Sequence, residues 1–173
     1  MPRKASHSSS PLRVLAFDPG FERLGVAVVT KENGKETLLH SDCIRTEASL
    51  PFSERLHILG AAAEAAIKKW QPNAVALEHI FFEKNAKTAI GVAEVKGMLS
   101  YIAATNNLPV FEYTPLAVKV AITGYGKSEK KAVAQMVLRL LTIPSLPGGK
   151  KALDDELDAI AVGLTCLASV RAV

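Results

Sequence analysis

The sequence has few cysteines and no long apolar run. Cys43 and Cys166 are the two cysteines among 173 residues, and neither belongs to a C-x-x-C motif. A disulfide framework and a zinc site are therefore not predicted. No apolar stretch approaches the ~20 residues that a membrane-spanning helix needs, and the basic, serine-rich start "MPRKASHSSSPL" lacks the apolar core of a signal peptide. These absences predict a cytoplasmic protein with no membrane partner.

Apolar residues, in contrast, are plentiful. They make up 49% of the chain, against 22% charged residues, which is typical of a packed globular protein. At 173 residues the chain is long enough for one well-packed domain and too short for two large ones. We therefore expect a single domain over residues 13–173, preceded by a disordered basic and serine-rich arm over residues 1–12.

The hydrophobic pattern predicts strands and helices in mixed order. Three strands are expected first, at residues 14–17, 25–30 and 37–44, and their short connections make them an antiparallel meander. Ser53 is a candidate N-cap for a helix that ends at Trp70. The remaining pattern predicts strands at 74–78 and 109–113 and helices at 87–106, 115–123, 128–141 and 153–169. This order indicates an α/β fold, with helices on both faces of a mixed five-stranded sheet.

Two of the expected apolar strands end in a carboxylate. Asp18 follows the first strand in "RVLAFDPG", and Glu78 ends the strand "AVALE". The Asp-Pro-Gly sequence is also typical of a simple turn, so Asp18 alone decides nothing. Strands that end together at one edge of a sheet form the usual site in such folds, and this edge would hold both carboxylates.

Charge is distributed unevenly in the last third of the chain. Between Pro115 and Lys151 a single acid, Glu129, stands against seven basic residues: Lys119, Lys127, Lys130, Lys131, Arg139, Lys150 and Lys151. Four acids follow at once: Asp154, Asp155, Glu156 and Asp158. Cations that hold phosphates beside carboxylates that hold a metal are typical of a nuclease. A solvated helix face would also explain the lysines.

The acids of the last helix occupy different sides of it. The expected apolar stripe comprises Leu157, Ile160, Ala161, Leu164 and Ala168. Asp158 and either Asp154 or Asp155 lie on one flank of this stripe and can face the sheet edge, whereas Glu156 points to the other side. Acids in a first helical turn are favourable by themselves, but this explains neither Asp18 nor Glu78. Because four converging carboxylates repel strongly, they predict Mg²⁺ or Mn²⁺, with two ions per site.

Four segments of the chain, taken together, resemble one protein family. The segments "FDPGFERLGVAVV", "ALEHIFFEKNAKTA", "PVFEYTPLAVKVAITGYGKSEKKAV" and "LDDELDAIAVGLT" are similar, in order and spacing, to the RuvC family of Holliday-junction resolvases over about residues 13–168. The resemblance implies a ribonuclease-H-like fold, a homodimer, and symmetric nicking of four-way DNA junctions with a divalent metal. It also implies a role in recombination and repair and a branch-migration motor as a further partner.

The resemblance also assigns roles to individual residues. It implies the catalytic and metal-binding acids Asp18, Glu78, Asp155 and Asp158, and so selects Asp155 over Asp154, while it leaves open Asp154 as an auxiliary metal ligand. Lys130 is implied as a catalytic residue. The implied DNA-binding residues are Phe81, which would stack on a base near the junction centre, and Lys119, Lys127, Lys130 and Lys131.

The helix expected at 87–106 is apolar on more than one side. Such a helix lies between layers of the fold or between subunits. For a dimer, the candidate contact residues are Ala89, Ile90, Ala93, Gly97, Leu99 and Ile102.

Three other functions are compatible with parts of the sequence. "DPGFERLG" also matches a phosphate loop of actin-like ATPases, but these need a second lobe that 173 residues cannot supply. A related nuclease that acts on RNA or on other branched DNA is a closer alternative. A junction-binding protein without catalysis is the third, and the intact acid set argues against it.

Overall fold

The protein forms one five-stranded sheet with helices on both faces. The computed structural model describes residues 11–79, 86–141 and 154–170. The strands are β1 (Leu12–Asp18), β2 (Arg23–Glu32), β3 (Lys35–Arg45), β4 (Ala74–Glu78) and β5 (Val110–Tyr113). The helices are α1 (Phe52–Trp70), α2 (Ala86–Thr105), α3 (Pro115–Thr123), α4 (Lys130–Leu140) and α5 (Asp154–Ser169). The predicted mixed α/β architecture is confirmed, and β1 takes in Leu12, the last residue of the expected arm.

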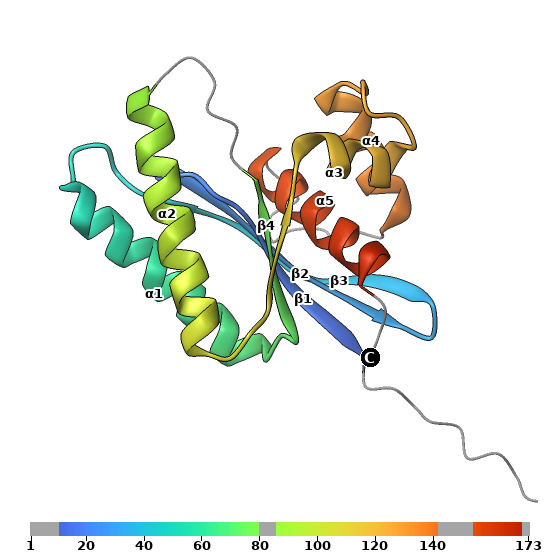
Figure 1. Ribbon diagram of the computed structural model, residues 1–173, viewed down its shortest axis with the longest axis horizontal. Coiled ribbons are helices and arrows are strands. Elements are labelled where there is room, and N and C mark those ends of the chain that lie inside the picture. Colours follow the sequence, from blue (N-terminus) through green and yellow to red (C-terminus); the bar gives the residue numbers. More distant parts are fainter. Residues whose placement is uncertain (1–10, 80–85, 142–153, 171–173) are drawn as a thin grey trace, which may run out of the picture.

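The sheet order is β3-β2-β1-β4-β5, with the first three strands antiparallel and β4 and β5 parallel to β1. Helices α1 and α2 cover one face, and α3, α4 and α5 lie on the other (Figure 1). Side chains of β1 alternate between the two cores: Leu15 and Phe17 pack with α1 and α2, whereas Val14 and Ala16 pack with α5. The next residue in this alternation, Asp18, therefore lies on the α5 side of the sheet.

The β2–β3 connection is a two-residue hairpin turn. Asn33 and Gly34 have φ of 51° and 80°, which is the backbone of a type I′ turn. The short connection predicted between these two strands is thus confirmed, and it fixes which residues of β2 and β3 stand opposite each other.

Two predicted helix starts are wrong by one or two residues. Ser53 is not the N-cap of α1, because Pro51 takes that position and its carbonyl accepts the backbone N–H groups of Glu54 and Arg55. Helix α4 begins at Lys130 and not at Ser128. The Ser128 hydroxyl is engaged with Thr123 Oγ1 at 2.7 Å, which holds it in the connection from α3.

The predicted faces of α5 and α2 also need correction. Helix α5 is buried on nearly all sides from Glu156 to Leu167, whereas Ala168, expected in its apolar stripe, is exposed beyond the packed part of the helix. In α2, Leu99 and Ile102 belong to the core between α2, α1 and the sheet, so they cannot also form a subunit interface. Within the described parts of the chain, no helix is long and apolar enough to cross a bilayer.

Candidate active site

Asp18 and Glu78 lie side by side at the edge of the sheet formed by the carboxyl ends of the adjacent strands β1 and β4. Strands β1 and β4 are parallel, and their last paired residues are Phe17 and Leu77. Glu78 follows the same alternation as Asp18, because Ala76 packs on the α5 side and Leu77 on the other. Both carboxylates therefore point toward the start of α5.

The start of α5 lies directly on β2 beside Asp18, because Gly25 lets the two backbones approach. A Cβ atom at Gly25 would lie 2.1 Å from the Asp155 carbonyl oxygen and 3.2 Å from the Asp18 Cβ. Asp155 is half-buried here, whereas Asp154 is exposed. The structure therefore brings Asp155 rather than Asp154 to Asp18, a choice that helical periodicity leaves open.

Glu156 points away from this edge, as its place on the helix predicts. Its side chain is buried against β3, where Ser41 Oγ donates a hydrogen bond to Glu156 Oε2 at 2.8 Å. The acidic group that faces the sheet edge therefore comprises Asp18, Glu78, Asp155 and Asp158.

Replacement of Gly25 by alanine tests this packing. We expect Gly25→Ala to destabilise the protein by about 1–3 kcal/mol, because the new methyl group collides with backbone atoms that cannot rotate away. Cleavage should fall further than stability explains, since the start of α5 carries Asp155 and Asp158. Thermal unfolding measures the loss of stability, and metal titration measures the displacement of Asp155 and Asp158. Wild-type metal affinity in a folded variant would contradict the assigned packing.

The four carboxylates are held close together with little solvent. Burial, followed by the charges of Glu78, Asp158 and Asp155, raises the pKa of Asp18 to about 8. Burial also raises the pKa of Glu78, with Asp158 adding to it, and burial raises the pKa of Asp158 although Lys130 opposes the shift. These carboxyl groups carry more negative charge than the fold stabilises by itself.

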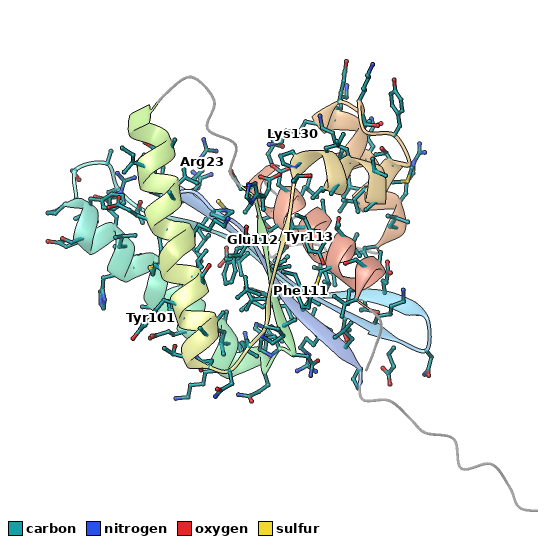
Figure 2. All side chains as sticks on the ribbon, in the orientation of Figure 1. Arg23, Tyr101, Phe111, Glu112, Tyr113 and Lys130 are labelled. Carbon is teal, nitrogen blue, oxygen red and sulfur yellow. The ribbon has the colours of Figure 1, made fainter. Side chains whose placement is uncertain are left out.

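Two cations of the chain partly offset this charge. Lys130 Nζ lies 2.5 Å from Asp158 Oδ2, and Arg23 Nη1 lies 3.4 Å from Asp155 Oδ2. Figure 2 shows Arg23 and Lys130 at the same end of the sheet. Arg23 was not predicted from the sequence. Its place five residues after Asp18 and two residues before Gly25 is the one sequence signal that points to it.

A cavity of about 300 Å³ opens beside the acids between α3, α4 and α5. Glu78, Asp158, Lys119 and Lys130 line it, together with the apolar residues Pro115, Val118, Val133 and Ala161. The structure thus brings two of the predicted lysines to the carboxylates. Lys127 and Lys131 are exposed and lie outside this lining. Phe81 lies outside the described residues.

The donor set has the chemistry of a divalent metal site. It consists of carboxylate oxygens, which hard cations such as Mg²⁺ and Mn²⁺ prefer, and a cation would relieve the repulsion that raises the pKa of Asp18. Within the described residues, no three acidic, histidine or cysteine side chains form a closed metal cage as they stand. Asp158 and Asp155 face Lys130 and Arg23 instead, so they would turn from these partners to hold an ion.

The sheet order, the flanking helices and the acids at the sheet edge define a nuclease of the ribonuclease-H-like class. The family model described as "Crossover junction endodeoxyribonuclease RuvC" matches residues 14–166. The chain belongs to the RuvC family, whose members are metal-dependent nucleases.

The chain is similar to known relatives over most of its length. It is 41% identical over 151 residues to the crossover junction endodeoxyribonuclease RuvC of Ruminiclostridium cellulolyticum, covering 87% of this chain and 89% of the relative. The structure of Thermus thermophilus RuvC in complex with Holliday junction substrate matches with a TM-score of 0.80 and 32% identity, over 90% of this chain and 93% of that one. The yeast mitochondrial Holliday junction resolvase Ydc2, at 13% identity and a TM-score of 0.63, shares the fold.

Proposed function

We propose that this protein is an endonuclease that resolves four-way DNA junctions by paired, symmetric nicks in recombination and repair. The observation that carries the proposal is the group of four carboxylates at one sheet edge, with the Asp18 pKa raised to about 8 and two cations beside them. Family membership and the junction complex of the Thermus relative support this substrate.

In the proposed reaction, Asp18, Glu78, Asp155 and Asp158 hold two Mg²⁺ or Mn²⁺ ions. The bound metal supplies charge that activates water and stabilises the leaving oxygen of a phosphodiester. Lys119 and Lys130 line the adjoining cavity, so their ammonium groups can hold the scissile phosphate and stabilise charge that develops on it. The exposed Lys127 and Lys131 contact the DNA backbone, and Phe81 stacks on a base near the junction centre.

Lys130 and Lys131 offer a matched pair for testing the lysine roles. We expect Lys130→Ala to lower the single-turnover cleavage rate about tenfold to a hundredfold at saturating DNA, because a cation facing the reacting phosphate is lost. Lys131→Ala removes an equal charge outside the cavity and should weaken binding only. If excess protein restores the Lys130→Ala rate, Lys130 acts in binding alone.

The proposed enzyme is a homodimer that joins through α2. A four-way junction is nearly two-fold symmetric, so two nicks need two chains related by a two-fold axis. Ile90 is 58% exposed and Tyr101 71% exposed on this helix, and Gly97 lies between them on the same side with open space around it. Ala93, on the same side, adds to this group of small and apolar residues, which lies beside the exposed Glu94 and which another copy can cover.

The cellular setting follows from the substrate. Four-way junctions form on chromosomal DNA, so the proposal places the enzyme in the cytoplasm of a bacterial cell with a branch-migration motor as a partner. The curated relatives at about 40% identity are bacterial.

A comparison of DNA and RNA–DNA substrates tests the proposed function. Purified protein is incubated with a synthetic mobile junction, a DNA duplex, a flap and an RNA–DNA hybrid, each with Mg²⁺ and with Mn²⁺. We expect the junction to be bound and cut in preference to the others. Preferred cutting of the hybrid or the flap would favour a related nuclease, and tight junction binding without cutting in either metal would indicate a binding protein.

A further inference from the structure

Arg23 and Arg45 lie directly opposite each other at the open end of the β2–β3 hairpin. The register of the two antiparallel strands pairs them. Like charges in directly opposed positions destabilise a sheet, so this placement is unfavourable unless an anion lies near both. The open end of the hairpin therefore concentrates positive charge beside the acidic group.

Both arginines face the active-site side of the sheet. Gly25, two residues after Arg23, contacts Asp155, and Cys43, two residues before Arg45, has its Sγ 3.7 Å from Asp155 Oδ2. Because alternate residues of a strand share a face, Arg23 and Arg45 point to the same side. Burial and the Asp155 charge raise the pKa of the Cys43 thiol, and a hydrogen bond with Arg45 partly opposes this, which places the guanidinium group beside Cys43.

Asp155 engages the arginine pair only in part. Arg23 contacts Asp155 at 3.4 Å with its side chain 55% exposed, and exposed pairs of this kind contribute little stability. Arg45 is exposed and forms no ion pair within the described ranges. Asp155 is also proposed to hold metal, and in that state it would be shared between the ion and Arg23.

We propose that Arg23 and Arg45 form a phosphate-binding pair that holds the cleaved DNA strand at a phosphate next to the scissile one. Guanidinium groups suit this role because their planar donors match phosphate oxygens in pairs. The pair lies on the β2–β3 side of the carboxylates, whereas Lys119 and Lys130 lie on the α3–α4 side. A strand that crosses the acids meets cations on both sides. This inference rests on the proposed nuclease function.

The salt dependence of junction binding tests the pair. Binding is measured in Ca²⁺, which takes the same oxygen ligands, with the DNA strands checked to be intact. Each of Arg23→Gln and Arg45→Gln should reduce the slope of log K against log salt by about 0.7–0.9, the value for one phosphate contact. Arg23→Lys should keep most of the slope because the charge remains. Lys35→Gln, at the opposite end of the same hairpin, is the matched control and should keep the wild-type slope.

Metal titration separates this role from simple charge balance. Arg23→Gln should bind Mn²⁺ at least as tightly as wild type, since it removes a competitor for Asp155, yet cut the junction about tenfold more slowly in single turnover. Wild-type slopes in both glutamine variants, or tighter junction binding, would show that the arginines only offset the acids and would overturn the proposal. A wild-type protein that binds no DNA would instead refute the nuclease function itself.

Discussion

Asp18→Asn should abolish nicking, lowering the rate by at least about a thousandfold, and should leave junction binding nearly unchanged. The loss is large because a metal-binding carboxylate supports several kcal/mol of transition-state stabilisation. Binding survives because DNA is held by the basic surface and not by the acids. Single-turnover cleavage and a junction-binding titration measure the two properties on the same preparation.

The same substitution should stabilise the metal-free protein. The pKa of Asp18 is raised to about 8 in the fold, against an ordinary value of 3.8. Between these values the folded state binds more protons than the unfolded state, so the free energy of unfolding falls as pH rises. Asparagine carries no such charge, and at pH 7.5 we expect a gain of at least about 1 kcal/mol. The difference should shrink toward pH 4, as thermal unfolding in a chelator would show.

Asp155 and Asp154 provide the matched control for the acids. Asp155→Asn should be as inactive as Asp18→Asn, whereas Asp154→Asn should cut at nearly the wild-type rate, because Asp154 is exposed on the first turn of α5. An active Asp155→Asn beside an inactive Asp154→Asn would show that α5 is placed one residue out of register.

Gly97→Glu should separate the subunits without unfolding them. A Cβ atom at Gly97 would meet nothing within 4 Å in the monomer, and glutamate is a better helix former than glycine. In the proposed dimer, however, two like charges would face each other across α2. We expect a light-scattering mass near 18.5 kDa in place of twice that value, together with loss of paired nicking.

Gly97→Ala is the control for this change. Alanine adds only a methyl group to the small-residue face, so the dimer and the paired cuts should persist. If Gly97→Glu remains dimeric, the interface lies elsewhere; if it is monomeric yet still makes two coordinated cuts, the symmetry argument fails.

The strand ends that carry Asp18 and Glu78 were predictable because the signal is local. An apolar run indicates the strand, and the carboxylate that follows it indicates where the strand ends and its side chains are no longer packed in the core. The choice between Asp154 and Asp155 was not available from helical periodicity, since positions four and three residues before Asp158 both lie on its side of the helix. The structure makes that choice through Gly25, whose contact with Asp155 joins residues 130 positions apart in sequence.

Other features escaped because they depend on tertiary context. In the sequence, Arg23 does not differ from other exposed cations. Only the fold, which places Asp155 of α5 beside it, shows its position at the site. Leu99 and Ile102 looked like interface residues because a helix that is apolar on several sides does not reveal which side faces the sheet. The helix α1 starts at Phe52 because Pro51 takes the N-cap position with an extended backbone and its carbonyl accepts the first helical N–H groups, without a side-chain cap of the kind expected from Ser53.

Cleavage of a supercoiled plasmid that extrudes a four-way junction tests the central claim most directly. Two coordinated nicks within one bound complex convert the plasmid to a linear molecule, whereas independent nicks leave an open circle. With Mg²⁺ or Mn²⁺ the wild-type protein should give linear DNA as the first product, with its two cuts at symmetric positions in strands of like polarity. Open circles alone, or an intact plasmid in the presence of bound protein, would contradict the assignment.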